Sequence, residues 1–271
     1  MEDIQRTAQL IKKVKRVLFL TSAGMSADSN IPTFRDKEGY WKNFPPFKEK
    51  GLEAQELASP WAFRNVLSHA WAFYEWRRRN AAENDPHEGY HIVNRWMKEI
   101  CKDSFIHTTN TDGYHIRSGA SPGQVKEVHG SMWRLQCLNS CTNEFWEDES
   151  VPLCELDFES MEASRYPLCR NCDQIARPHI LMFGDFEYVG HRKQEEKFHD
   201  FMNADTDLAL LIGSSGAVPT NDFIALSLKK KGATVININP DLSSDSIVRS
   251  DIFIRMKSRE ALMKIEGFLI N

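Results

Sequence analysis

The run Val17-Leu18-Phe19-Leu20, followed by Thr21-Ser22-Ala23-Gly24-Met25-Ser26, decides the fold of this chain. Four consecutive apolar residues next to charged ones predict a parallel strand that is buried on both faces of a sheet. Small residues directly after such a strand let backbone amides approach an anion at the start of a helix. Taken alone, this turn is better interpreted as an ordinary strand-to-helix connection, because Gly-x-Gly-x-x-Gly is absent and Ser22 stands where a first glycine is expected.

The same pattern of short strands followed by polar or glycine-containing loops recurs along the chain. Predicted strands cover residues 104–108, 124–128, 208–212, 234–238 and 252–254. They are followed by the polar loop 109–115, by His129, by the anion-cradle composition of 213–219 and by Asn239-Pro240. Helical spacing of apolar residues predicts helices over 3–14, 60–80, 88–100, 192–204, a stretch ending at Lys229-Lys230-Lys231-Gly232, and 258–269. This alternation predicts an α/β fold with a Rossmann-like, doubly wound parallel sheet.

Composition limits the classes of function. The 34 basic and 38 acidic residues give a net charge of −4, which provides no electrostatic argument for nucleic-acid binding. No apolar run approaches the roughly 18 to 20 residues that cross a bilayer, so no membrane partner is expected. The acidic start, Met1-Glu2-Asp3-Ile4, lacks the features of a targeting peptide. A cytoplasmic location is expected by default, and a nuclear one is left open.

Four of the six cysteines form two close pairs, Cys137-x3-Cys141 and Cys169-x2-Cys172. These pairs resemble two halves of a metal site brought together across an insert, and four thiolates suit tetrahedral Zn²⁺. Such a site has no open position and is structural. Of the two remaining cysteines, Cys101 is predicted to be a small buried apolar residue, and Cys154 has no close partner in the sequence. The acidic insert 142–168 is predicted to be poorly structured with a solvated face, although its charge could also favour basic protein substrates.

Residues 30–60 contain several prolines and glycines, as expected for a lid or binding segment. At its start, Phe34 could shield a reactive centre from water and Arg35 could hold an anion. The alternatives are a hydrophobic anchor and a surface charge. The aromatic residues between 60 and 100 are expected mostly to form the core of a helical insert.

These segments, in this order, resemble the sirtuins, the NAD-dependent protein-lysine deacylases, from Val17 to about Asn239. The family's Gly-Ala-Gly-x-Ser and Gly-Ile-Pro-Asp-Phe-Arg match Ser22-Ala23-Gly24-Met25-Ser26 and Asn30-Ile31-Pro32-Thr33-Phe34-Arg35. Its Thr-Gln-Asn-x-Asp and His-Gly match Thr108-Thr109-Asn110-Thr111-Asp112 and His129-Gly130. Its Arg-Pro, Phe-Gly-Glu, Gly-Thr-Ser and Ile-Asn match Arg177-Pro178, Phe183-Gly184-Asp185, Gly213-Ser214-Ser215 and Ile238-Asn239.

The resemblance implies NAD and zinc as cofactors and acylated protein lysines as substrates. The acyl oxygen would attack the nicotinamide ribose, nicotinamide would leave, and the acyl group would end on ADP-ribose. His129 would take a proton from a ribose hydroxyl, because a histidine titrates near neutral pH. Asn110 would orient a water or ribose hydroxyl. A lone histidine is more often structural, but this one follows a strand, precedes a glycine and has its companions in sequence, which favours catalysis.

The resemblance also assigns the other cofactor residues. Asp112 would bind the nicotinamide amide, Phe34 would exclude water, Arg35 would bind phosphate, and Asn239 would hold the adenosine ribose. Ser26, Ser214 and Ser215 would donate to the diphosphate. Ser22, Ala23, Gly24, Thr109 and Gly213 complete the cofactor-binding set. On this basis 1–36, 101–136 and 175–271 form the NAD-binding domain, and 37–100 with the zinc module 137–174 form a smaller one.

Three departures from the family pattern bear on rate and acyl preference. Thr109 replaces a glutamine, Ser22 replaces a glycine, and Asp185 replaces a glutamate. Because Asn110, Asp112 and His129 are retained, NAD binding is still expected. The changed loops also motivate a rival prediction, an NAD glycohydrolase or mono-ADP-ribosyltransferase on the same scaffold. A second rival is a non-catalytic NAD- or ADP-ribose-binding module, against which the retained His129 argues.

A further likeness concerns the acyl group. Leu57-Ala58-Ser59-Pro60 and Phe73-Tyr74-Glu75-Trp76-Arg77 resemble the sirtuin branch that removes succinyl, malonyl or glutaryl groups. Tyr74 and Arg77 lie three residues apart on a predicted helix, hence on one face, where they could jointly bind a carboxylate. The alternative is a core tyrosine beside a solvated basic run. Ala58, Ile180, Leu181 and Phe183 are predicted to complete the substrate site; the oligomeric state is not specified.

Overall fold

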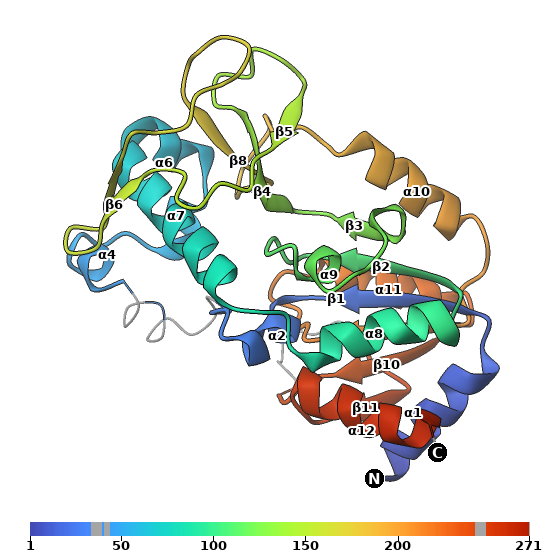
Figure 1. Ribbon diagram of the computed structural model, residues 1–271. Coiled ribbons are helices and arrows are strands. Elements are labelled where there is room, and N and C mark those ends of the chain that lie inside the picture. The colour runs from blue at the N-terminus through green and yellow to red at the C-terminus, as the bar shows by residue number, and fades with distance from the viewer. Residues whose placement is uncertain (34–39, 41–43, 242–247, 271) are drawn as a thin grey trace.

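The computed structural model describes residues 1–33, 40, 44–241 and 248–270, and Figure 1 shows two lobes. The larger lobe is a six-stranded sheet with helices on both faces. The smaller lobe carries α4, α6 and α7 together with the short strands β4 to β8. The doubly wound α/β architecture predicted from the sequence is confirmed.

The large sheet has the order β11-β10-β9-β1-β2-β3, and every neighbouring pair is parallel. Its strands match the predicted apolar runs within one or two residues. Their bounds are β1 Arg16–Thr21, β2 Asp103–Thr108, β3 Val125–Glu127, β9 Leu208–Ile212, β10 Thr234–Ile238 and β11 Ile252–Ile254.

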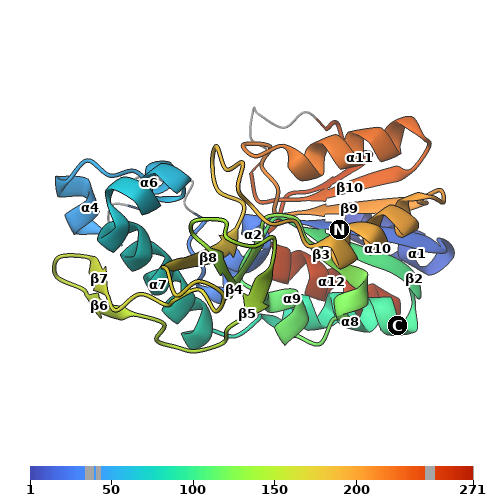
Figure 2. The same cartoon turned by 90° about the horizontal axis from the view of Figure 1, so that it is seen from above.

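Two hydrophobic layers cover the sheet because successive strand side chains point to opposite faces. Val17 and Phe19 of β1 belong to the core cluster that includes α1, α8 and α12 residues. Leu18 and Leu20 belong to the second cluster, which includes residues of α10 and α11. Figure 2 shows α8 and α12 on one side of the sheet and α11 on the other. A strand buried on both faces must therefore be apolar along its whole length, as the sequence is.

Strand register brings four loops to one edge of the sheet. Thr21 pairs with Thr108 on one side and with Ile212 on the other, and Ile212 pairs with Ile238. The loops that begin at residues 22, 109, 213 and 239 therefore leave the sheet side by side. The chain runs outward in both directions from the β1–β9 boundary, which is the switch point where open α/β sheets bind ligands.

The helices largely follow the predicted spans. They are α1 Glu2–Lys13, α2 Ala23–Ser26, η1 Ala27–Ser29, α4 Pro45–Glu49, α5 Ala54–Leu57, α6 Pro60–Asn65, α7 Leu67–Glu83, α8 Glu88–Glu99, α9 Tyr114–Arg117, η2 Pro122–Gln124, α10 Arg192–Met202, α11 Thr220–Lys230 and α12 Ser258–Ile270. The single helix expected over 60–80 is wrong, because Val66 leaves helical geometry (φ −137°, ψ 49°) and separates α6 from α7. Within the described residues, none of the helices combines the length and apolar character needed to span a bilayer.

The smaller lobe differs from the sequence prediction in two respects. The insert 142–168 is not poorly structured: β5 Phe145–Glu147 pairs with β4 Gly130–Cys137, and β6 Glu155–Asp157 pairs with β7 Glu162–Ser164. Its acidic side chains occupy the outward positions of the β6–β7 hairpin, while Ala163 is buried. In a strand of three residues, the alternation of apolar and polar side chains is too short to be recognised in a sequence with so many charged residues. The structured insert nevertheless keeps the expected exposed acidic face.

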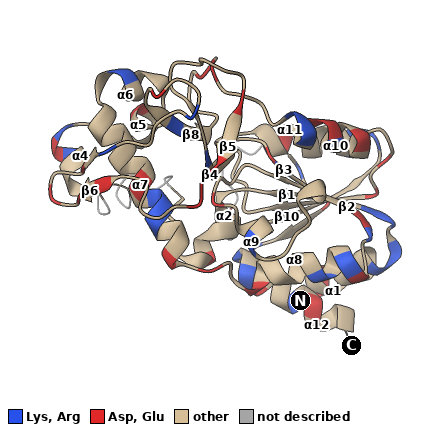
Figure 3. Ribbon diagram, turned by 45° about the horizontal axis from the view of Figure 1, so that its top comes forward, with Lys and Arg blue, Asp and Glu red and all other residues tan. Residues whose placement is uncertain are grey.

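The predicted domain limits also need correction. α8, placed in the helical insert, packs against β2 and α12 of the larger lobe. β4, placed in the cofactor domain up to residue 136, belongs to the antiparallel sheet β5-β4-β8, in which β8 spans Ala176–Ile180. In Figure 3, segments coloured for basic and for acidic residues occur on both lobes.

Candidate active site

The first and second glycine-containing loops touch backbone to backbone at the switch point. The Gly24 amide donates to the Gly213 carbonyl at 3.0 Å. A Cβ on Gly24 would lie 2.7 Å from the Gly213 Cα, and one on Gly213 would lie 2.3 Å from the Met25 nitrogen. Gly213 also has a φ of +68°, which side chains rarely adopt. Glycine is required at both positions, and Ala23 begins α2 directly beside this contact.

The polar loop after β2 is tied to the first loop by a buried network. Asn110 Nδ2 donates to the Ser22 carbonyl at 3.1 Å and to Ser26 Oγ at 2.9 Å. The Ser26 hydroxyl donates to Asp112 Oδ2 at 2.6 Å, and Tyr90 OH lies 2.7 Å from Ser26 Oγ. Burial raises the pKa of the Asp112 carboxyl, while the Ser26 and backbone hydrogen bonds oppose that rise. The structure thus brings together three segments that are far apart in sequence, namely residues 22–26, Tyr90 and residues 110–112.

His129 lies between β3 and β4 with its ring orientation set by one hydrogen bond. Its Nδ1 is 3.2 Å from the Thr109 carbonyl oxygen. A carbonyl only accepts hydrogen bonds, so Nδ1 carries the hydrogen and Nε2 presents the lone pair of a base. Burial lowers the pKa of His129, which keeps the imidazole neutral at neutral pH. The ring is half-buried, as a proton-accepting group at the edge of a crevice needs to be.

Gly130 explains why glycine follows this histidine. Its φ is +78°, and a Cβ here would lie 2.1 Å from the His179 carbonyl oxygen. The close approach lets β4 pair with β8 immediately after His129, where Gly130 is opposite Ile180. The Leu181 amide then donates to the His129 carbonyl at 3.0 Å. The backbone at His129 is therefore held by the end of β8.

Two of the departures from the family pattern contact each other. Thr109 Oγ1 donates to Ser22 Oγ at 3.1 Å. Asn221, in the first turn of α11, donates from Nδ2 to the same Ser22 Oγ at 3.0 Å and to the Thr21 carbonyl at 2.8 Å. Its Oδ1 lies 2.8 Å from His107 Nδ1. Asn221 was not predicted as a site residue, because the sequence marks it only as a polar residue two positions after Pro219.

The second cofactor loop is also fixed by side-chain hydrogen bonds. The Ser214 hydroxyl donates to Asp222 at 2.6 Å, and Asn239 Nδ2 donates to the Ser214 carbonyl. Ser214, Ser215 and Asn239 are buried along this edge of the sheet. Their contacts with diphosphate and ribose stay predictions, as does that of Ser26. Phe34 and Arg35, predicted to exclude water and to bind phosphate, lie outside the described residues.

The predicted substrate residues gather around the end of β8. The Phe183 amide donates to the Ala58 carbonyl at 2.9 Å, which joins the α5–α6 connection to the segment after β8. Leu181 and Phe183 are 37% and 52% exposed and so present apolar surface beside His129, whereas Ile180 is 5% exposed. Ile180 therefore supports the strand and offers little side chain to a substrate.

Asp185, which stands where the family has the longer glutamate, forms a buried ion pair with Arg177. Arg177 Nη1 and Nη2 donate to the two Asp185 oxygens at 2.7 and 3.1 Å. Asp185 also accepts from the Glu187 amide at 3.0 Å. Because both side chains are buried and two hydrogen bonds join them, this ion pair fixes the turn that carries Phe183.

Tyr74 and Arg77 lie on the inner face of α7, as their spacing predicts. Tyr74 is buried, and its hydroxyl has no hydrogen-bond partner among the described residues. Arg77 places its guanidinium 5.4 Å from the Tyr74 ring centre and donates to Thr111 Oγ1 at 3.3 Å. The alternative of a solvated basic run is wrong, because Arg78 is buried and bonded to three backbone carbonyls and Arg79 pairs with Glu75.

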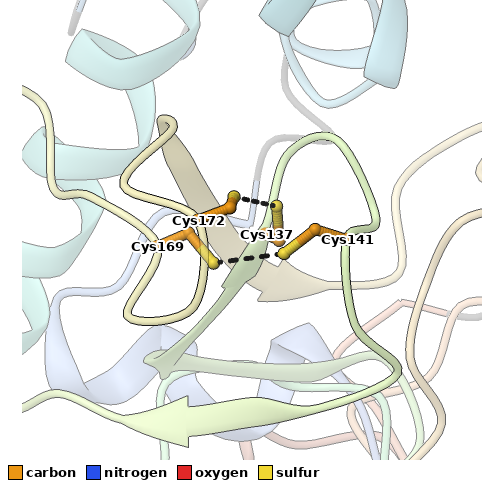
Figure 4. A group of neighbouring side chains, drawn as sticks. All are labelled: Cys137, Cys141, Cys169 and Cys172. Carbon is orange, nitrogen blue, oxygen red and sulfur yellow. Dashed lines mark hydrogen bonds between the residues drawn. The ribbon is translucent and has the colours of Figure 1, made fainter.

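The four predicted metal ligands converge, as Figure 4 shows. Their sulfur atoms all lie within 4.8 Å of one another, with Cys137 Sγ 3.7 Å from Cys172 Sγ and Cys141 Sγ 3.6 Å from Cys169 Sγ. Tetrahedral zinc with Zn–S bonds of about 2.3 Å separates its sulfurs by about 3.8 Å, so the residues fit this ion. Cys101, in contrast, is buried away from the cluster as predicted.

Comparisons with known proteins agree with this geometry. A family model described as "Sir2 family" matches residues 22–220. An NAD-dependent protein deacylase of Aquifex aeolicus is 31% identical over 93% of this chain and 95% of its own. One of Leptospira interrogans is 33% identical over 93% and 92%.

Solved structures give the same result. A Sir2 homologue in complex with NAD matches with a TM-score of 0.78 and 26% identity, covering 97% of this chain and 93% of its own. A mutant Sir2 homologue bound to 2'-O-acetyl-ADP-ribose matches with a TM-score of 0.79 and 26% identity, covering 98% and 96%.

Fold and site together define a doubly wound α/β enzyme whose loops at the switch point suit a dinucleotide, with a half-buried histidine and a four-cysteine zinc module. The chain belongs to the Sir2 family. The predicted resemblance is thereby confirmed.

Proposed function

We propose that the protein is an NAD-dependent protein-lysine deacylase that moves the acyl group of an acylated lysine to ADP-ribose and releases nicotinamide. The observation that carries the proposal is the His129 imidazole, whose Nδ1 is held by the Thr109 carbonyl at 3.2 Å. This contact leaves Nε2 as the proton acceptor. The two relatives described above are themselves NAD-dependent protein deacylases.

NAD, when bound, supplies the ribose carbon that receives the acyl oxygen and the hydroxyl that becomes acylated. The chain's own residues bind and orient these groups. Asn110 and Asp112 meet at Ser26, within the network that closes the nicotinamide end of the crevice. His129 accepts the proton of the ribose hydroxyl at Nε2. Gly24 and Gly213 let the backbone approach the diphosphate, while the four cysteines hold zinc away from the chemistry.

We further propose that the preferred acyl groups end in a carboxylate, as succinyl and malonyl do. The Tyr74 hydroxyl is buried and has no partner among the described residues, and the Arg77 guanidinium lies 5.4 Å from the centre of the Tyr74 ring. Burial raises the pKa of Tyr74 to about 12, so the phenol remains a hydrogen-bond donor. A buried donor without a partner is unfavourable, and an incoming carboxylate would satisfy it. Ala58 supports this proposal because a small side chain leaves room beside the acyl-lysine.

The test compares kcat/KM on one peptide carrying succinyl-lysine or acetyl-lysine. Arg77→Met should lower succinyl-lysine turnover by about 10- to 100-fold, because a charge-assisted hydrogen bond contributes about 1.5–3 kcal/mol. Tyr74→Phe should lower it by about 2- to 10-fold, since a neutral bond is worth about 0.5–1.5 kcal/mol. Arg64→Met is the matched control, an exposed arginine that pairs with Glu187. An enzyme that prefers acetyl-lysine equally in all four forms would refute the acyl assignment.

A cytoplasmic location is proposed with this function. A zinc site built from four thiolates requires reduced cysteines, which a reducing compartment maintains. Fractionation that places the protein only in an oxidising compartment would contradict it.

A further inference from the structure

A cavity of about 710 Å³ lies between the two lobes, and its lining includes none of the residues assigned above to cofactor, acyl-lysine or zinc. It is enclosed by the end of α7, by α9 and η2, by β3 to β5 and by α10. These elements surround one region between the lobes in Figure 1. The deacylase chemistry therefore gives this cavity no role.

Part of the lining is apolar and flat. The Trp133 indole, Ile116, Pro122, Val151 and Ala82 contribute to the walls. The indole is held in place, because its Nε1 donates to the Asp112 carbonyl at 2.6 Å. A fixed aromatic face beside aliphatic side chains suits a planar apolar ligand.

A buried arginine forms the polar part of the inner wall. Arg134 is 8% exposed; its Nη2 pairs with Glu127 and its Nε with Glu147 at 2.9 Å. Its Nη1 has no hydrogen-bond partner among the described residues. The two ion pairs therefore hold Glu127 and Glu147 in place in the cavity wall, and the buried Nη1 is not accessible to a ligand.

The cavity's outer wall adds two cations. Lys193 and Lys197 lie one turn apart on α10, hence on the same face of that helix. Within the described residues, neither lysine forms an ion pair. Among the carboxylates of the lining, Glu127 and Glu147 pair with Arg134, and Glu149 has no ion-pair partner in the described part of the chain. Arg134 offsets only one of its two carboxylate partners, so the lining as a whole is close to neutral, and its unpaired positive charge is concentrated at Lys193 and Lys197.

We propose that this cavity is a binding site, separate from the cofactor crevice, for a small organic anion with a flat aromatic body. The aromatic body lies against Trp133 and Ile116, and the anionic group is held by Lys193 and Lys197. Glu127 and Ser131, which line the cavity, stand two residues before and after His129. Occupancy therefore regulates the enzyme through the backbone that carries His129 and through the Trp133 contact with Asp112.

The binding test uses 8-anilinonaphthalene-1-sulfonate, an aromatic sulfonate that fluoresces in apolar surroundings. The wild-type protein should show saturable binding at one site per chain. Lys193→Glu with Lys197→Glu should weaken binding at least tenfold, and Ala82→Trp, which fills the cavity, should abolish it. The control is Lys230→Glu with Lys231→Glu, two exposed lysines at the end of α11, which should stay within twofold of wild type. Circular dichroism confirms that each variant is folded.

Equal affinity in the wild type and the Lys193/Lys197 variant, or no saturable binding in the wild type, would overturn the site. Regulation is tested separately and rests on the proposed deacylase activity. Saturation with the probe should change wild-type kcat/KM at least twofold and leave folded Ala82→Trp unaffected. An unchanged wild-type rate at saturation would overturn regulation alone. Absence of any deacylation would instead refute the proposed function, which the fluorescence titration does not use.

Discussion

Replacing Asn221 by alanine tests the contact that links the cofactor loops. The Asn221 side chain is 0% exposed and makes hydrogen bonds of 2.8 Å to the Thr21 carbonyl, 3.0 Å to Ser22 Oγ and 2.8 Å to His107 Nδ1. Each bond nets about 0.5–1.5 kcal/mol, and an orphaned buried group costs about 1–3 kcal/mol. The Thr21 carbonyl and Ser22 hydroxyl keep Thr109 as a partner, so only His107 Nδ1 is orphaned. The expected loss is about 3–5 kcal/mol.

Asn237 provides the matched control for this substitution. It is also an asparagine at 0% exposure, but neither side-chain atom has a hydrogen-bond partner among the described residues. Asn237→Ala removes an unsatisfied amide and should cost about 1 kcal/mol or less. Urea unfolding with linear extrapolation, supported by calorimetry, measures both variants. Asn221→Ala should lie about 3 kcal/mol below Asn237→Ala, which corresponds to a Tm lower by about 10 °C.

The same pair of variants separates stability from catalysis. Asn221 holds Ser22, Ser22 accepts from Thr109, and the Thr109 carbonyl orients His129. Asn221→Ala should therefore lower kcat/KM about tenfold at a temperature where both variants are folded, less than the roughly 100-fold of a full 1 Å misplacement. Asn237→Ala should retain wild-type activity. Equal stability losses and equal rates in the two variants would refute the reasoning.

Four further outcomes are expected. Removing zinc with a chelator should unfold the smaller lobe and abolish activity, since a structural site supplies folding energy; an unchanged melting curve would contradict this. Because burial lowers the pKa of His129, the acid limb of the kcat/KM profile should have its midpoint below about 6.5, not above it. His107 has its pKa lowered by burial to about 3, so between pH 6.5 and 3 it takes up a proton on unfolding and stability falls with falling pH. His107→Gln should reduce that slope by about 1 kcal/mol per pH unit on average, measured by urea unfolding across pH 7 to 5. Gly130→Ala should abolish activity because its Cβ would meet the His179 carbonyl at 2.1 Å, whereas Gly190→Ala, with open space around it, should not.

The strands of the large sheet could be predicted because burial on both faces requires short, wholly apolar runs. Val17–Leu20 and Leu208–Ile212 are apolar at every position and only four and five residues long, which favours buried strands over helices. The short strands of the smaller lobe gave no such signal. β6 and β7 have three residues each, and their outward positions are charged, so only pairing along the hairpin defines them.

The residues of the candidate site also divide into those that the sequence predicts and those that only the fold reveals. His129, Asn110 and Asp112 could be named because they follow predicted strands in motifs that resemble those of the family. Asn221 could not, since its partners Thr21 and His107 are brought to it only by the fold. The contact between Ser22 and Thr109 was equally hidden, although both positions stood out as departures from the family pattern. A sequence displays unusual residues one at a time, whereas their mutual compensation is a property of the packed structure.

The central claim is that the His129 imidazole drives acyl transfer to ADP-ribose. Mass spectrometry of NAD incubated with a succinyl-lysine peptide tests it most directly. The wild-type protein should form nicotinamide, succinyl-ADP-ribose and free peptide in equal amounts, and His129→Ala should form none of the three acyl-transfer products. Two results would contradict the account. One is nicotinamide release at the same rate without any peptide, and the other is formation of the three products by His129→Ala in the same amounts as by the wild type.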